Sequence, residues 1–217
     1  FFPVISRLLD NEPSKAKDVY EKACRYLFVF SLIFAVSLSL FSSEIINLLF
    51  GTKYAGSASV LFIVAWGVIP LSMDMLLNSI LIAMNKQRYS VIYGGVTLGV
   101  NFVAASLLIP IYGHMAAAYM ALSSYTLVAF FSLYFISKNG FPLVLDKIMA
   151  KTFLAGLISI IVILLLKPVS ISFAAFSGIA VYFLLLLATR IFPASELILV
   201  KVVAELVYSR GGSRRNG

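Results

Sequence analysis

Charged and metal-binding side chains are scarce in this sequence. Among its 217 residues only 12% are charged, and it holds nine carboxylates, one histidine and one cysteine. A single cysteine excludes an internal disulfide framework, and a lone histidine cannot build a metal site. Catalysis needs positioned acids, bases or a metal, and neither a GxxxxGK[ST] loop nor an HExxH sequence occurs. The sequence therefore predicts no enzyme, no bound metal and no other cofactor.

Apolar residues are abundant, by contrast, and make up 61% of the sequence. A soluble domain usually carries about 25% charged residues, so a chain this apolar cannot cover a surface that faces water. Six stretches are long enough to cross the ~30 Å of hydrocarbon in a bilayer. They are residues 26–42, 60–84, 89–109, 115–136, 152–166 and 171–187, of which the fifth is the shortest.

These six stretches are predicted to be helices. Backbone polar groups in lipid must be paired internally, so a span is either a helix or a strand of a closed barrel. A barrel strand alternates between apolar and polar residues over about ten positions, and runs such as 158–166 do not alternate. The expected fold is therefore all-α: a polytopic membrane helix bundle with about six transmembrane helices.

Basic residues alternate between the two sides of this arrangement. All but two of the 17 Lys and Arg residues lie in the N-terminal flank, the second and fourth loops or the C-terminal flank; the exceptions are Lys53 and Lys167. Because Lys and Arg near span ends favour the cytoplasm, the sequence predicts a multi-pass protein of the cell membrane with both termini cytoplasmic. The net charge of +8 is assigned to contact with anionic membrane lipids rather than with nucleic acid.

The predicted spans divide the chain into three regions. Residues 1–25 form a cytoplasmic loop and a helix that leads into the first span, and residues 26–192 form the six-helix bundle. In residues 193–217, one helical face carries Leu197 and Val200 beside Lys201, which is typical of a helix lying on the membrane surface. The end of the chain after this helix is expected to be disordered.

Asp74 is the carboxylate that lies deep inside a predicted span. It is ten residues from Met84 at the predicted cytoplasmic end, or roughly 15 Å along a helix and close to the middle of the bilayer. A charged Asp there costs about 2.5–3.5 kcal/mol, so it must face protein or a water-filled cavity. Asn78 follows one turn later, and Pro70, one turn earlier, is expected to kink the helix. This combination predicts a substrate or ion pathway; the alternative is a buried polar contact that joins two helices.

Asn101, inside the third span, is a further candidate for that pathway, with a helix–helix hydrogen bond as the alternative. Gly95 and Gly99 form a GxxxG pattern, which indicates close helix packing. Glu44 is expected to be exposed at the membrane interface, and His114 is expected to lie in a short outer loop.

Three segments, taken in order, resemble a known family. Residues 2–8 read FPVISRL and resemble an FPxxSRL segment, and residues 45–54 contain IINLLFGTKY and are similar to IxxLLFGxxY. Residues 109–118 resemble an IPxYGxxGAA turn, with Ala116 in place of the second glycine. Together they resemble the C-terminal half of polysaccharide and lipid-linked oligosaccharide flippases, of the O-antigen and teichoic-acid exporter type. That type belongs to the superfamily that also contains multidrug exporters.

The resemblance implies one lobe of a two-lobe exporter with twelve to fourteen spans. Such a protein works by alternating access and flips a lipid-linked glycan precursor across the cytoplasmic membrane. The implied partners are membrane lipids, the lipid-linked glycan and an N-terminal lobe of the same protein. No Lys or Arg lies deep in a span, so no residue of this chain is assigned to a diphosphate.

Two other functions remain open at this point. An ion-coupled multidrug exporter would share the fold and would equally use Asp74. A non-transporting membrane protein of envelope assembly would need no carboxylate in mid-membrane. A membrane-embedded glycosyltransferase is disfavoured, because the predicted outer loops are short and no acidic catalytic motif is present.

Overall fold

The computed structural model describes residues 2–142 and 147–188. Within these residues the chain is helical, with short connections and no strand, so the all-α prediction is confirmed. The elements in chain order are α1 (Phe2–Asn11), α2 (Pro13–Leu40), α3 (Ser42–Phe50), η1 (Thr52–Tyr54), α4 (Ser57–Val64), η2 (Ala65–Gly67), α5 (Val68–Ala83), α6 (Gln87–Tyr112), α7 (His114–Lys138), α8 (Lys147–Leu166) and α9 (Ile171–Ala188).

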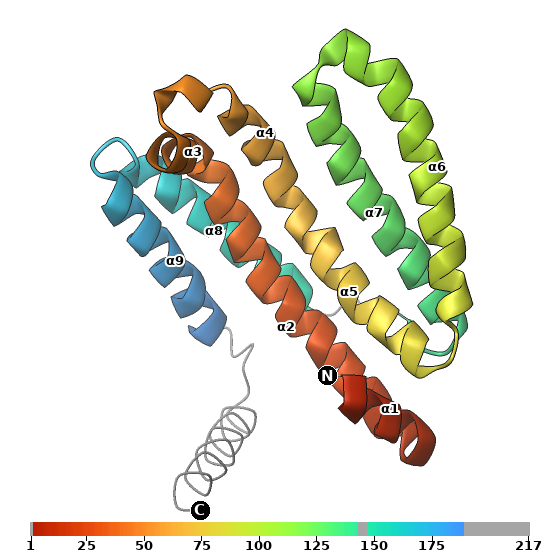
Figure 1. The fold of residues 1–217 in the computed structure, drawn as a ribbon. Helices are drawn as coiled ribbons and strands as arrows, with labels where there is room; N and C mark the ends of the chain where they lie inside the picture. The colour runs from red at the N-terminus through yellow and green to blue at the C-terminus, as the bar shows by residue number, and fades with distance from the viewer. Residues whose placement is uncertain (1, 143–146, 189–217) are drawn as a thin grey trace, which may run out of the picture.

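The long helices pack in an order that differs from their order in the chain. Helix α9 packs on α8, α8 on α2, α2 on α5, α5 on α7 and α7 on α6, as Figure 1 shows. Helix α2 therefore lies inside the bundle, with the α8–α9 pair on one side of it and the α6–α7 pair beyond α5 on the other.

The predicted spans correspond to these helices. Within the described residues, five helical stretches are long and apolar enough to cross a membrane, and the apolar segment Phe173–Ala188 of α9 is a shorter sixth. Helix α2 runs without a break from Pro13, which is well placed at a helix start because its missing N–H has no partner there anyway. It therefore crosses the boundary expected at residues 25 and 26. The membrane-surface helix and tail expected for 193–217 lie outside the described residues.

Two expected boundaries are wrong. The fifth span begins before Thr152, because α8 already includes Lys147; lysine is a good helix former, so the helix extends beyond the apolar run. At 20 residues it is still the shortest of the five described helices that are long enough to cross a membrane. The third span continues through Pro110 to Tyr112, and the reversal falls at Gly113, whose φ of 58° favours glycine. His114 is consequently the first residue of α7 rather than part of a loop.

Two buried apolar clusters hold the bundle together. The first joins α1, α2, α5, α6 and α7 and contains the fully buried Ile5, Leu77 and Ile136. The second joins α2 to α8 and α9 around Val29 and Ile163. Helix α2 contributes to both clusters, so it fixes the two sides of the bundle relative to each other.

Candidate functional site

Asp74 faces the neighbouring helix α7 from the middle of α5. Its Oδ1 atom accepts a hydrogen bond from the hydroxyl of Ser132 on α7, and Ser132 is fully buried. Tyr93 on α6 also lies close to both residues. Asp74 itself is half-buried. Polar groups from three helices therefore meet at this carboxylate. A charged side chain inside a membrane is costly in free energy, and such polar neighbours reduce that cost.

Asn78 lies one turn further along α5 and continues the same network. Its Oδ1 atom accepts a hydrogen bond from the Ser90 hydroxyl of α6. The hydroxyl of Tyr93, a residue only 4% exposed, donates to Ser90 Oγ at 3.3 Å. Asp74, Asn78, Ser90, Tyr93 and Ser132 thus form one group, called the Asp74 cluster below, where α5, α6 and α7 meet.

Asn101 is not part of this cluster. It lies eight residues after Tyr93 on α6, or about 12 Å further along the helix axis. Its Oδ1 atom accepts a hydrogen bond of 2.6 Å from Ser124 on α7. The Met120 carbonyl of its own helix is also 2.6 Å from Ser124 Oγ, so the single hydroxyl hydrogen is shared or exchanged between the two acceptors. In this structure Asn101 links α6 to α7 at a place separate from Asp74.

Pro70 is the third residue of α5, immediately after an irregular turn. The turn η2 is a 3₁₀ segment that interrupts the second span between α4 and α5. Because proline has no N–H, the carbonyl of Trp66 four residues earlier lacks its usual α-helical partner. At Gly67 an added Cβ would lie 2.6 Å from the ring of Tyr125, so α7 approaches closely here. A 3₁₀ segment inside a helix is common at hinges.

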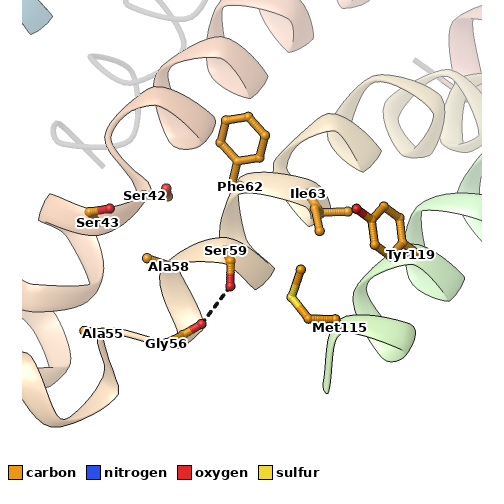
Figure 2. Close-up of a pocket in the computed structure, with 10 residues that line it drawn as sticks. All are labelled: Ser42, Ser43, Ala55, Gly56, Ala58, Ser59, Phe62, Ile63, Met115 and Tyr119. Carbon is orange, nitrogen blue, oxygen red and sulfur yellow. Dashed lines mark hydrogen bonds between the residues drawn. The ribbon is translucent and has the colours of Figure 1, made fainter. Parts of the chain in front are cut away.

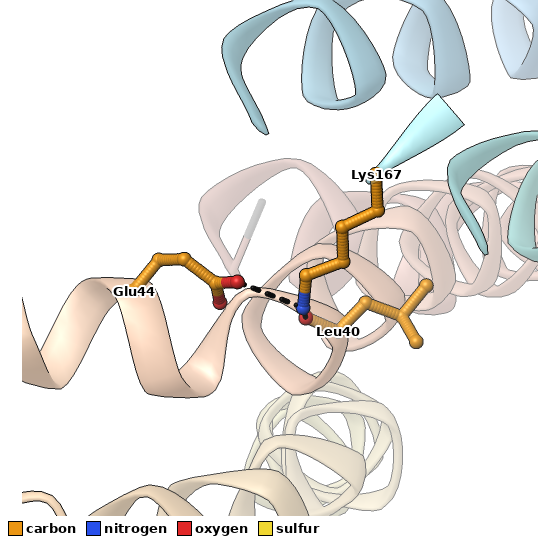
Figure 3. A network of polar contacts seen from close by, with 3 residues as sticks. All are labelled: Leu40, Glu44 and Lys167. Atoms are coloured by element: carbon orange, nitrogen blue, oxygen red, sulfur yellow. Dashed lines mark hydrogen bonds and ion pairs between the residues drawn. The ribbon is translucent and has the colours of Figure 1, made fainter. Parts of the chain in front are cut away.

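A polar contact that the sequence did not reveal lies at the opposite end of the bundle from α1 (Figure 3). Lys167 Nζ, after the end of α8, is 2.9 Å from Glu44 Oε1 and donates to the carbonyl of Leu40 at 2.6 Å. Leu40 is the last residue of α2, where unpaired carbonyls attract a cation. The expectation that Glu44 is exposed is therefore wrong, because the lysine at this helix end holds it. The only clue in the sequence was that both charges fall at the predicted outer side.

A cavity of about 530 Å³ lies at this same end, between α3, α4 and α7, and Figure 2 shows its lining. Three serines, Ser42, Ser43 and Ser59, and two aromatic residues, Phe62 and Tyr119, contribute to its wall. These residues come from three separate places in the chain, so their meeting could not be predicted. In the described part of the chain no group of three or more His, Cys, Asp or Glu side chains is placed to hold a metal.

The GxxxG pattern of α6 does not serve the role expected for it within the described residues. An added Cβ at Gly95 or Gly99 would meet nothing within 4 Å. The close helix approaches fall instead at Gly67, Gly156 and Gly178. The prediction that Gly95 and Gly99 mark a close contact is therefore wrong for the helices that the structure describes.

A bundle of long apolar helices with a buried carboxylate network is the architecture of a multi-pass membrane protein. Comparison with known proteins defines the family: the model described as "Lipid II flippase MurJ" matches residues 1–192. The chain belongs to this family, which confirms the resemblance to flippases of lipid-linked precursors in its broader form. The description is that of a transporter, in agreement with the prediction that the chain is not an enzyme.

A curated relative is similar over most of the chain. The uncharacterized membrane protein MJ1068 of Methanocaldococcus jannaschii is 27% identical over 169 residues, or 76% of this chain. The chain spans 33% of the length of that relative. No solved structure matches the chain.

Proposed function

We propose that this chain is the C-terminal lobe of a flippase that moves lipid-linked oligosaccharide or polysaccharide precursors across the cytoplasmic membrane. The observation that carries the proposal is the match of the flippase family over residues 1–192. The proposed partners are membrane lipids, the lipid-linked glycan and an N-terminal lobe of the same protein. Nucleic acid is not among them.

The distribution of basic residues supports an orientation with both termini in the cytoplasm. The connection between α5 and α6, the last residues of α7 and helix α1 lie at one end of the bundle (Figure 1). The first two carry Lys86 and Lys138, whereas Lys53 lies in η1 at the other end. Because cytoplasmic segments are rich in Lys and Arg, the end with α1 is the proposed cytoplasmic end.

This orientation is tested with two single cysteines in a background without other cysteines. In intact cells, Lys53→Cys should react with a membrane-impermeant maleimide, and Lys86→Cys should react only after the membrane is permeabilised. The reverse pattern would invert the proposed orientation.

In the proposed mechanism the Asp74 cluster lies on the substrate or ion pathway, at the place where α5, α6 and α7 meet. These three helices rearrange during alternating access. The interrupted second span, with η2 just before α5, gives α5 a place to bend. Asp74 and Asn78 keep polar partners on different helices, so a shift of one helix changes the contacts of both. A carboxylate at this depth is also suited to coupling with an ion.

The test is a translocation assay with the full-length protein in liposomes. Asp74→Asn keeps the side-chain shape and removes the charge, and it should slow flipping of a fluorescent lipid-linked oligosaccharide about tenfold or more, equivalent to about 1.4 kcal/mol in the barrier. Asp18→Asn is the matched control, because Asp18 is exposed on α2, and it should flip at the wild-type rate.

Comparing substrates decides which lipid-linked precursor the protein flips. Lipid II, an O-antigen precursor and a teichoic-acid precursor are compared in the same liposomes, and we propose that the protein prefers a precursor of the O-antigen or teichoic-acid type. Wild-type rates for Asp74→Asn would reduce Asp74 to a packing contact. Absence of flipping for every precursor would overturn the proposal in favour of multidrug export or a role without transport.

A further inference from the structure

The outer cavity, formed by the start of α3, by α4 with the segment leading into it and by the start of α7, has the dimensions of a ligand site. Its volume of about 530 Å³ falls within the range of roughly 300–1,000 Å³ that is usual for such sites. It lies at the end of the bundle that is proposed to face away from the cytoplasm. The cavity is separate from the Asp74 cluster, with which it shares no residue.

The hydroxyl groups of this cavity have unused hydrogen-bonding capacity. Ser42 is only 6% exposed, and among the described residues its hydroxyl has no hydrogen-bond partner; the same is true of Ser43 and Tyr119. The Ser59 hydroxyl donates to the carbonyl of Gly56 at 2.9 Å (Figure 2), which leaves its oxygen able to accept. The Ser42 hydroxyl lines the cavity and is therefore available to pair with a polar group that enters it.

The remainder of the wall is aromatic, aliphatic or small and carries no charge. Phe62 and Tyr119 are the aromatic members of the wall, Ile63 and Met115 are its aliphatic members, and the small residues Ala55, Gly56 and Ala58 leave room for close approach. Because no Lys or Arg lines the cavity, a phosphate or diphosphate would lack the cationic donors that such groups need. The ligand that fits is therefore neutral, with hydroxyl groups on its edges and C–H groups on its faces.

A neighbouring cavity gives a useful contrast. It has a volume of about 340 Å³, lies between α6 and α7, and shares Met115 and Tyr119 with the first. Its other lining is mainly apolar, and its serine, Ser123, already donates to the Tyr119 carbonyl of its own helix at 2.8 Å. Unpaired serine hydroxyls thus distinguish the first cavity from an ordinary apolar gap between helices.

We propose that the cavity lined by Ser42, Ser43, Ser59, Phe62 and Tyr119 binds an uncharged sugar ring of the glycan at the outer end of the bundle. Serine hydroxyls pair with the hydroxyls of the sugar, and the two aromatic rings cover its apolar faces. The proposal rests on the proposed flippase function and adds to it a place where the glycan is held on the outer side.

The direct test measures protection by sugar of a cysteine placed in the cavity. In the full-length protein without other cysteines, Ser43→Cys lies in the cavity, and Ile111→Cys, 72% exposed near the end of α6, is the control outside it. Saturating maltose or N,N′-diacetylchitobiose should slow the reaction of Ser43→Cys with a maleimide at least threefold and leave Ile111→Cys unchanged. Sorbitol, which has hydroxyls but no ring, should protect neither.

Three results would overturn the proposal, and absence of sugar protection is the first of them. Equal protection of both cysteines would show a general change in accessibility, and protection by pyrophosphate but not by sugars would assign the cavity to a phosphate. These results are independent of transport: flipping without sugar protection removes the sugar site and keeps the flippase. Sugar protection without flipping of any precursor would keep the sugar site and remove the flippase function.

A second measurement uses the concentration of lipid-linked glycan that gives half-maximal flipping. Tyr119→Leu and Ser42→Ala should each raise this concentration about threefold to tenfold with little change in the maximal rate, since they weaken binding alone. Ser123→Ala in the neighbouring cavity is the matched control and should behave as wild type. Unchanged half-maximal concentrations for both cavity variants would contradict the assignment.

Discussion

The two sides of the bundle are held together by different kinds of polar contact. On the α8–α9 side, side chains donate to backbone carbonyls of neighbouring helices: Tyr182 to Val29 at 2.7 Å and Ser159 to Gly178 at 2.7 Å. On the α6–α7 side, side chains bond to other side chains, as in the pairs Ser132–Asp74, Ser90–Asn78 and Ser124–Asn101.

Burial differs in the same direction. The apolar stretches of α2 and α8 are 44% and 33% buried, whereas those of α6 and α7 are 11% and 17% buried. A backbone carbonyl in a helix is fixed, while a serine hydroxyl turns about its bond and can exchange one partner for another. The α2–α8–α9 side is therefore expected to move as one unit, and the α6–α7 side is expected to supply the rearrangement that transport requires.

The largest expected effect tests the close packing of the α8–α9 side. A Cβ added at Gly178 would lie 2.2 Å from the Ile163 side chain, so Gly178→Val should destabilise the protein by about 1–3 kcal/mol through overpacking. The measurement is thermal unfolding of the purified full-length protein in detergent.

Gly99→Val is the matched control on the other side of the bundle. An added Cβ there meets nothing within 4 Å, so the substitution should change stability by less than about 0.5 kcal/mol. Equal destabilisation by the two variants would contradict the distinction, because it would mean that α6 is packed as tightly as α9.

A smaller effect tests the exchangeable contacts of the α6–α7 side. Ser132→Ala removes the hydroxyl that donates to Asp74 and should cost about 1 kcal/mol, the usual size for a hydrogen bond between membrane helices. Ser106→Ala removes a hydroxyl that donates to its own helix at Phe102 and should be neutral. Combining Ser132→Ala with Asp74→Asn in a double-mutant cycle isolates the pair. A coupling energy near zero would show that the hydroxyl does not hold the carboxylate.

The contrast between the two sides also explains how far the sequence could predict the structure. Spans are local features, since a long apolar run identifies a helix without knowledge of its neighbours. The closeness of Asp74 and Asn78 was equally local, because residues four apart share a helix face. Boundaries failed where a second local effect competed with hydropathy, as at Pro110, where the helix continues past a proline to Gly113.

Partners in other helices could not be predicted in the same way. Ser132 is 58 residues from Asp74, and in spans that are apolar on every face no periodicity marks which side meets which neighbour. The serines of the outer cavity looked like ordinary residues at span ends for the same reason. GxxxG is a local pattern too, and it marked Gly95 and Gly99, while the closest approach falls at Gly178, which has no such pattern.

The smallest expected effect concerns the contact between the end of α2 and the segment after α8. Lys167 and Glu44 are 30% and 25% exposed, so water screens their attraction only in part, and the lysine also satisfies the Leu40 carbonyl. Lys167→Met keeps much of the apolar side chain and should lower stability by about 0.5–1 kcal/mol. Glu44→Gln should cost less, because the lysine keeps its carbonyl partner. If Lys167→Met leaves stability unchanged in low salt, where ion pairs are strongest, the α8–α9 side depends on its apolar contacts and backbone carbonyl bonds alone, and the outer ion pair can open during transport without disturbing that unit.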